Sequence, residues 1–179
     1  MRRGKMLAIG AVALSLVGAG ATALAAGTSS GGTIQVFVNN ISSTKAKVLI
    51  TGAIGDFGTS LTVDKDGKLD ANGSYQKTTL KKGGFWLNTT ALTKTINHGK
   101  PVINHSTCTF QFTGSAPAPL FNGTGAYAGI AGTLKITVTF AAITPRFASG
   151  ARKGQCNFAQ NAPALDSYQA IGATGKVSF

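Results

Sequence analysis

Acidic residues are scarce in this chain of 179 residues. It contains no glutamate, and only five aspartates stand against 17 lysines and arginines. Histidine and cysteine occur twice each. The chain has no G-x-S-x-G elbow, and the D-F-G triplet at Asp56 has no phosphate-binding or catalytic loop to accompany it. The glycines near residue 125 miss the dinucleotide-binding spacing. These absences argue against kinases and dinucleotide-binding enzymes and leave a Ser-His-Asp triad unsupported by any motif.

Long apolar segments are also missing, except at the N-terminus. Three basic residues lie within the first five positions, an apolar run extends from Met6 to about Val17, and Ala23-Leu24-Ala25 follows. These are the three parts of a secretory signal peptide. The sequence therefore predicts a signal peptide over residues 1–26, cleaved near Ala25 or Ala26, and a secreted protein with no stable membrane span afterwards. A retained anchor is the alternative, and Arg2-Arg3 leaves the twin-arginine route open.

The composition after residue 26 favours an all-β protein of one domain. Removing the predicted signal peptide leaves a net charge near +9. The chain has 24 glycines and many threonines, few leucines and no long 3.6-residue periodicity, which together favour strands and turns. Residues 27–44 are predicted to form a Gly/Ser/Thr-rich linker with one short strand around Ile34–Val38. The main domain is predicted over residues 45–179.

Period-two alternation predicts a series of short strands joined by tight turns. Asp66-Gly67 and Asn72-Gly73 are typical turn dipeptides. The strands are expected to close into a single antiparallel β-barrel of about eight strands, with a β-sandwich as the alternative. An outer-membrane barrel is a further alternative, because apolar residues alternate up to the terminal Phe179. Beyond a strand that begins near Lys45, the expected strands are Thr59–Val63, Ser74–Leu80, Phe85–Ile96, Pro101–Thr113, Thr133–Ile143 and Tyr168–Phe179.

The two cysteines, Cys108 and Cys156, predict a structural disulfide. Closing a loop of nearly 50 residues would stabilise the fold by roughly 4 kcal/mol in the chain-entropy description. The alternative is a zinc site that also uses His98 and His105, but their spacing matches no compact zinc module. Similarly, the aspartates between residues 56 and 70 suggest either turns or a calcium loop. The calcium pattern lacks its ligand spacing and closing glutamate, so turns are predicted and no metal or other cofactor.

A glycine-rich turn around one tyrosine precedes the strand that ends at Phe140. Residues 122–133 read N-G-T-G-A-Y-A-G-I-A-G-T. This segment resembles the G-G-T-G-x-Y-x-G-A-x-G motif of dirigent proteins and allene oxide cyclases, a motif shared by many small exported actinobacterial proteins. The resemblance implies an eight-stranded antiparallel barrel and a dimer or trimer. The predicted fold-motif residues are Gly123, Gly125, Tyr127, Gly129 and Gly132, which turn the backbone while the Tyr127 ring packs beneath.

The resemblance does not bring catalytic residues with it. Allene oxide cyclases use a buried glutamate, which this chain lacks. Dirigent proteins use aspartates in the barrel mouth, and the candidates here, Asp56 and Asp166, have no matching motif around them. The sequence therefore predicts a non-enzymatic exported barrel, with a cyclase- or dirigent-type isomerase or coupling guide as the alternative.

Two kinds of partner are predicted for such a barrel. Trp86 and several phenylalanines are candidates to line a mouth that binds a small apolar ligand, although core packing also explains them. Arg146, Arg152 and Lys153 lie in one Pro- and Gly-containing loop and are candidates to contact an anionic envelope polymer. Phe147 is the one aromatic residue of that loop, so nucleic acid is not an expected partner.

Overall fold

The computed structural model describes residues 30–159 and 162–179, which form nine strands and one helix. The predicted signal peptide lies outside the described residues. In chain order the elements are β1 (Gly31–Asn40), β2 (Lys45–Gly52), β3 (Asp56–Val63), β4 (Tyr75–Leu80), β5 (Gly83–Asn88), α1 (Thr90–His98), β6 (Val102–Asn104), β7 (Thr109–Gly125), β8 (Ala131–Ile143) and β9 (Asp166–Ser178).

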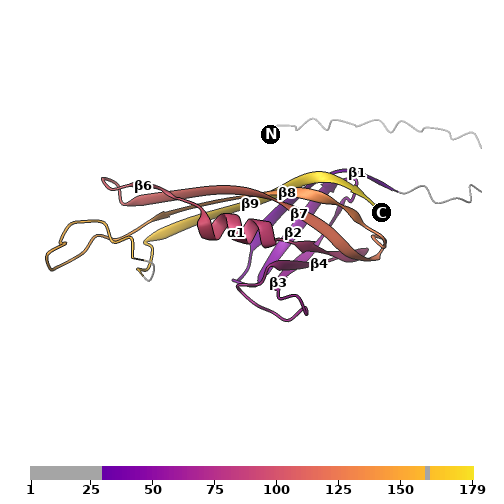
Figure 1. The fold of residues 1–179 in the computed structure, drawn as a ribbon, viewed down its shortest axis with the longest axis horizontal. Helices are drawn as coiled ribbons and strands as arrows, with labels where there is room; N and C mark the ends of the chain where they lie inside the picture. Colours follow the sequence, from indigo (N-terminus) through magenta and orange to yellow (C-terminus); the bar gives the residue numbers. More distant parts are fainter. Residues whose placement is uncertain (1–29, 160–161) are drawn as a thin grey trace, which may run out of the picture.

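All nine strands belong to one antiparallel sheet in the order β5-β4-β3-β2-β1-β9-β8-β7-β6. A further pairing between β5 and β7 closes eight of these strands into a barrel, and β6 is the additional strand at the end of the order (Figure 1). The closed antiparallel barrel predicted from the sequence is thereby confirmed over the sandwich alternative. Closure pairs the backbone groups of what would otherwise be two exposed sheet edges.

Alternating side chains divide the barrel wall into an apolar inner face and a polar outer face. In β2, Ala46, Val48 and Ile50 are buried while the residues between them are exposed. In β8, Leu134, Ile136 and Val138 are buried in the same way. Each fully buried aliphatic side chain of this size contributes about 1.5–3 kcal/mol through removal from water. The inner face is therefore the hydrophobic core that holds the barrel together.

The predicted boundary at Lys45 is corrected by the position of β1. This strand hydrogen-bonds to β2 on one side and to β9 on the other, from Ile34 to Val38 in both registers. Ile34 and Val36 are buried in the core. The segment therefore belongs to the middle of the barrel wall and is not a strand within a linker. The barrel begins at Gly31.

The predicted strand Phe85–Ile96 is wrong in its second half. β5 ends at Asn88, and α1 follows from Thr90. The Asn88 side-chain oxygen accepts a hydrogen bond from the Thr90 N–H at 3.0 Å, which satisfies a donor at the start of the helix. Leu92 is the buried residue of α1, and the helix packs against β7. At four residues apart, Leu92 and Ile96 share one helical face.

The predicted strand Pro101–Thr113 is also corrected, because it divides into β6, a turn and the start of β7. β7 continues to Gly125 through Pro117 and Pro119. β5 pairs with β7 between Leu120 and Gly125, and β6 pairs with it between Thr109 and Gln111. The prolines lie between these two contacts, where β8 is the strand partner of β7 and α1 lies alongside (Figure 1). On the side away from β8, this stretch of β7 is paired with none of the described strands, and a free strand edge of this kind tolerates residues that lack an N–H.

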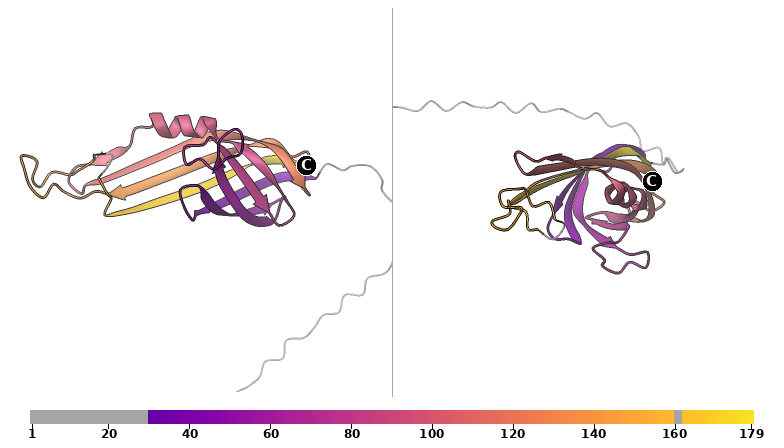
Figure 2. Two further views of the ribbon diagram at one scale, coloured as in Figure 1. Left: turned by 90° about the horizontal axis from the view of Figure 1, so that it is seen from below. Right: turned by 60° about the vertical axis from the view of Figure 1, so that its left-hand side comes forward.

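β7, β8 and β9 extend well beyond the barrel as a narrow sheet. Figure 2 shows this distal extension, which comprises β6, the ends of the three long strands, and the loop residues 144–159 and 162–165. Thr109 pairs with Ile143, and Ile143 pairs with Asp166, at its far end. Cys108 and Cys156 form a disulfide there with a Cα–Cα distance of 5.2 Å, which confirms the predicted pairing and excludes their thiolates as zinc ligands.

Removing the disulfide is expected to destabilise the protein. In the double variant Cys108→Ala/Cys156→Ala, the unfolding free energy should fall by about 2–4 kcal/mol, because the unfolded chain regains the freedom that the cross-link removes. Urea denaturation with and without reductant measures this. The wild type in reductant should match the variant in oxidising buffer, and the variant should not respond to reductant. Equal stability of all four samples would contradict the expectation.

The apolar alternation of β9 faces the interior of the barrel. Val177 belongs to the buried core, with Ile171, Ala173 and Phe179 packed against it. Membrane barrels show the opposite arrangement, with apolar residues directed outward to lipid. Among residues 30–159 and 162–179, no helix is long and apolar enough to cross a membrane.

Candidate functional site

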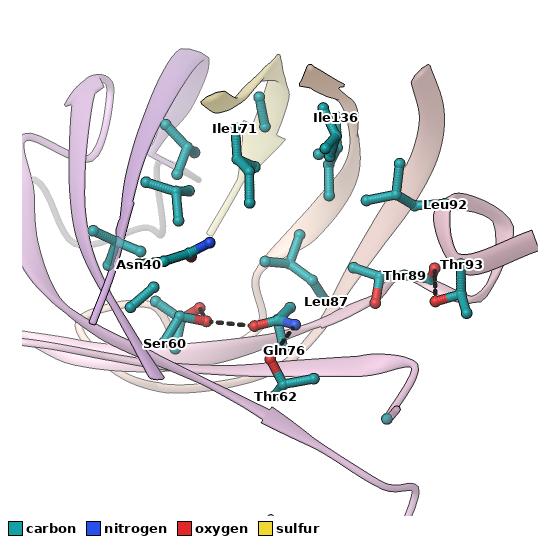
Figure 3. A pocket seen from close by; sticks show the side chains of 18 of the residues that line it. Asn40, Ser60, Thr62, Gln76, Leu87, Thr89, Leu92, Thr93, Ile136 and Ile171 are labelled. Carbon is teal, nitrogen blue, oxygen red and sulfur yellow. Dashed lines mark hydrogen bonds between the residues drawn. The ribbon is translucent and has the colours of Figure 1, made fainter. Parts of the chain in front are cut away.

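The interior of the barrel contains a cavity of about 440 Å³. It opens at the end formed by the β1–β2 turn, the β3–β4 loop and the C-terminal part of α1 (Figure 3). The exposed residues around this mouth are mostly polar, and Lys45 is the one charged side chain among the described residues that line the cavity. The exposed polar residues are Asn40, Ser42, Ser43, Lys45, Asn72, Asn97 and Gln169.

The two sides of the cavity differ in chemistry. One side is apolar and is formed by β1, β2, β8 and β9, with Ile136 and Ile171 visible in Figure 3. The other is a polar strip of four residues on β3 and β4, defined as Ser60, Thr62, Gln76 and Thr78. Ser60 donates to the Gln76 side-chain oxygen at 3.1 Å, and the Gln76 amide donates to Thr62 Oγ1 at 3.0 Å. Ser60 and Thr78 hydroxyls lie 3.2 Å apart.

The polar strip was not predicted from the sequence. Its signal is the placement of hydroxyl and amide residues at inward positions of β3 and β4, where an ordinary core would have aliphatic residues. The strip is internally hydrogen-bonded, which fixes its side-chain orientations. Because a neutral glutamine amide has two N–H donors and the hydroxyls have two lone pairs each, the strip retains capacity to bind a polar group.

α1 lies across one side of the mouth. Leu92 and Thr93, labelled in Figure 3, line the cavity from this helix together with Ile96, which is 43% exposed because it lies at the opening. The Thr93 hydroxyl donates to the Thr89 carbonyl oxygen at 3.2 Å, so it is satisfied within the helix. The helix therefore presents an apolar face to whatever occupies the mouth.

The opposite end of the barrel is closed by the glycine–tyrosine turn between β7 and β8. Tyr127 is buried, and its ring packs edge-to-face against Phe85 and Phe179 at centroid distances of 6.3 and 5.5 Å. Phe85 in turn lines the cavity. Tyr127 therefore packs beneath the turn and behind Phe85, which forms the floor of the cavity.

A buried hydrogen bond anchors this floor to the first half of the barrel. The Tyr127 hydroxyl donates to Asp56 Oδ2 at 2.7 Å, and the same oxygen accepts from the Lys82 N–H at 3.0 Å. Asp56 Oδ1 accepts from the Phe57 N–H at 2.7 Å. Three donors thus surround a carboxylate that is 6% exposed. Charge-assisted bonds of this kind are about twice as strong as neutral ones.

These contacts shift both pKa values. Burial alone would raise the pKa of Asp56, but the hydrogen bonds from Tyr127, Lys82 and Phe57 outweigh it and hold that pKa below its usual range. Burial, the hydrogen bond to Asp56 and the negative charge of Asp56 raise the pKa of Tyr127 to about 12. At neutral pH the pair is therefore a carboxylate and a phenol, which is the arrangement that the hydrogen bond requires.

The glycines of the motif are needed for close backbone approach. A Cβ atom on Gly123 would lie 1.8 Å from the Tyr127 carbonyl oxygen. Gly125, Gly129 and Gly132 have positive φ angles of 61°, 80° and 138°, which L side chains rarely adopt. Asn122 also has a positive φ, of 51°, and asparagine tolerates this conformation.

The other predicted mouth residues lie elsewhere. Asp56 is at the closed end, and Asp166 is exposed at the start of β9, where it accepts a hydrogen bond from the Ser167 N–H at 2.8 Å. Neither lines the cavity. Trp86 lies on the outer side of the barrel, in contact with Phe121 at 5.9 Å between ring centroids. Among the aromatic candidates, Phe85 is the one that lines the cavity.

The three basic loop residues, Arg146, Arg152 and Lys153, differ in the contacts that their charged groups make within the protein. Arg146 donates from its two terminal nitrogens to the carbonyl oxygens of Gly154 and Ser106, both at 2.6 Å, so its guanidinium fastens the loop to the β6–β7 turn. Arg152 stacks on Phe147 at 4.1 Å from the ring centroid, and Lys153 is exposed. The loop lies at the far end of the distal extension (Figure 2), and none of these three basic residues lines the cavity.

The aspartate-rich segment forms the turns between β3 and β4. Asp64 Oδ1 accepts from the N–H groups of Asp66 and Lys68 at 2.9 Å, and Asp70 Oδ1 accepts from the Asn72 N–H at 2.9 Å. These are the local side-chain bonds for which aspartate is favoured in turns. Within the described parts of the chain, no three histidine, cysteine or aspartate residues gather as potential metal ligands.

Comparison with known proteins gives no match: neither a protein-family model, nor a curated protein, nor a solved structure is significantly similar to this chain. The resemblance to dirigent proteins and allene oxide cyclases therefore stays a prediction from one motif. The function has to be inferred from the cavity and the barrel surface.

Proposed function

We propose that this protein binds a small, mainly apolar molecule inside its barrel and does so without catalysis. The observation that supports this proposal is the cavity of about 440 Å³, which Phe85 lines at its inner end, with Tyr127 packed behind that ring, and which is open at the other end. Pockets for small molecules range over about 300–1,000 Å³ and combine apolar walls with a few polar groups. The barrel interior has both properties.

The two-sided lining indicates the kind of ligand. The apolar side favours a hydrocarbon or aromatic body, and the neutral polar strip favours a hydroxyl or carbonyl group along one edge of it. An enzyme of the cyclase or dirigent type would need an acid or base at the reacting atoms. Among the described residues that line the cavity there is one lysine, at the mouth, and no carboxylate or histidine. Binding is therefore the better supported proposal.

We also propose that the protein works outside the cytoplasm. The disulfide between Cys108 and Cys156 supports this location, since such bonds persist in oxidising compartments. The predicted signal peptide supports it independently. Mass measurement of the protein purified from its own culture supernatant tests both, because it reads the cleavage position and the two protons lost on disulfide formation. An intact N-terminus in a cell-associated protein would contradict the proposal.

Filling the cavity should weaken ligand binding strongly. Ala173 lines the cavity from β9, whereas Ala170 is on the opposite face of the same strand. With the neutral fluorescent probe N-phenyl-1-naphthylamine, the Ala173→Phe variant should bind at least about tenfold more weakly than the wild type, because the new ring occupies the probe's space. Ala170→Phe is the matched control and should bind normally. Fluorescence titration measures both, and thermal denaturation checks that both variants fold.

Equal probe affinity in the two alanine variants would contradict the binding proposal. Native mass spectrometry of the purified protein provides a second measurement, because a ligand retained from the cell adds its own mass. That mass should be absent from Ala173→Phe and present in Ala170→Phe. A retained molecule found equally in both variants would place the binding site outside the barrel.

A further inference from the structure

Three large apolar side chains form a row on the outer wall of the barrel. Phe37 of β1 lies opposite Leu49 of β2, and Leu49 lies opposite Phe57 of β3. They are 53%, 50% and 55% exposed. All three line one shallow hollow of about 660 Å³. We refer to these three residues as the outer apolar row. Singly exposed apolar residues need no explanation, but a contiguous row in a hollow indicates a docking site.

Lysines accompany the outer apolar row. Lys47 and Lys81 line the same hollow, and the Lys81 ammonium lies 5.5 Å from the centroid of the Phe57 ring. Among the described residues that line the hollow there is no carboxylate. Asp56, the neighbour of Phe57 in sequence, is buried and bonded to Tyr127, so it does not neutralise this surface. The wall is therefore both apolar and cationic.

The same hairpin forms the wall of the cavity. Val38 of β1 and Val48 of β2 line both the outer hollow and the cavity. Asn40 and Lys45, at the turn end of these strands, belong to the cavity mouth. A partner docked on the outer apolar row would therefore lie beside the mouth, a few residues away along β1 and β2.

We propose that this outer wall docks on the surface of an anionic lipid bilayer. Apolar side chains that enter the headgroup region, flanked by lysines that attract anionic lipids, are the two elements of peripheral membrane binding. A soluble polyanion would engage the lysines but gain nothing from three exposed apolar residues. A second copy of this chain would bring Lys47 and Lys81 against their own counterparts, in a protein whose net charge stays near +9 without the predicted signal peptide. The bilayer is the occupant that suits both the charge and the apolar surface.

Vesicle flotation tests the proposal with the mature, disulfide-bonded protein. Vesicles of phosphatidylcholine alone are compared with vesicles in which a third of the lipid is phosphatidylglycerol. The wild type should float with the anionic vesicles, remain below with the neutral ones, and detach as salt is raised. The Lys47→Gln/Lys81→Gln variant should bind anionic vesicles about 30-fold more weakly, at about fivefold per lysine. The affinity of Phe37→Ser/Phe57→Ser for anionic vesicles should fall by a comparable or larger factor.

Matched controls separate this surface from general basicity. Lys100→Gln/Lys153→Gln removes two exposed lysines on or near the distal extension, and Ile143→Ser removes an apolar side chain that is 44% exposed on β8. Both should float like the wild type. Circular dichroism confirms folding, and the lysine variant changes exposed residues alone, so it tests the proposal even if the phenylalanine variant is unstable.

Four results would overturn the proposal. One is normal flotation of both the lysine variant and the phenylalanine variant with anionic vesicles. Another is an equal loss of vesicle binding in the two control variants. The third is a dimer in sedimentation analysis that Phe57→Ser abolishes while vesicles do not bind, which would show that a second copy covers the row. Retention by soluble polyphosphate without vesicle binding would equally overturn it. No cavity ligand is added in this assay, and Ala173→Phe, which blocks the cavity, should float normally, so the outcome of the flotation assay is independent of the proposed function.

Discussion

Replacing Asp56 with alanine is expected to lower the unfolding free energy by about 3 kcal/mol or more. The change leaves the buried Tyr127 hydroxyl and the Lys82 N–H without their acceptor, and each buried donor that loses its partner costs about 1–3 kcal/mol. Urea denaturation at neutral pH measures the effect. Asp166→Ala is the matched control, because Asp166 is exposed, and should change stability by less than about 0.5 kcal/mol.

The same pair sets how stability changes with pH. Because the folded pKa of Asp56 lies below its ordinary value of 3.8, its contribution is present above that pH and is lost as the pH falls further. The pKa of Tyr127 is raised from 10.0 to about 12, so its contribution is complete below pH 10 and is lost as the pH rises toward 12. Tyr127→Phe should remove the alkaline decline, whereas Tyr168→Phe, at a 66% exposed position, should retain it. Parallel alkaline curves for all three proteins would contradict this assignment.

The strands that could be predicted are those whose side chains alternate without interruption. β8 was predicted almost to its bounds, since Leu134, Ile136 and Val138 are separated by polar residues. The strand predicted over Pro101–Thr113 stops well short of the end of β7 at Gly125. The part of β7 that was missed contains Pro117 and Pro119, which are unfavourable inside a sheet. They are tolerated because this stretch of β7 lies between its contacts with β6 and β5. That gap depends on tertiary structure and cannot be deduced from local sequence.

The helix was missed because its apolar residues are few. Phe85 and Leu87 alternate as a strand, and the spacing changes only afterwards, from two residues to the four between Leu92 and Ile96. Four threonines between residues 89 and 95 favour strand by propensity. The packing of α1 on β7 overrides that preference. Asn88, which bonds the Thr90 N–H, was the available signal for the change.

The candidate site was only partly visible in the sequence. The glycine–tyrosine turn was identified, but its partner Asp56 lies 71 residues away and could not be paired with it beforehand. The outer apolar row does have a local signal: β1 and β2 each contain three consecutive apolar residues, Val36–Val38 and Val48–Ile50. Alternation then places at least one apolar residue of each strand outside. The register that aligns Phe37, Leu49 and Phe57 comes from the structure alone.

Gly123→Ala is expected to have the largest effect of any single methyl group added to the motif. Its Cβ would lie 1.8 Å from the Tyr127 carbonyl oxygen and 2.9 Å from the Ile130 side chain, so the turn has to move. The unfolding free energy should fall by more than about 3 kcal/mol, in the range of severe steric substitutions. The control is Gly129→Ala, where no atom lies within 4 Å and the φ of 80° costs about 1–2 kcal/mol.

The difference between these two variants separates close approach from backbone conformation, and equal losses would contradict the steric argument. The comparison also extends to the cavity. The turn positions Tyr127 against Phe85, and Phe85 lines the floor. If the turn moves in folded Gly123→Ala, the closed end opens to water and affinity for N-phenyl-1-naphthylamine should fall, while Gly129→Ala retains it. The glycine motif would then affect ligand affinity by holding Tyr127 and Phe85 in place at the closed end of the cavity, without any of its residues touching the ligand.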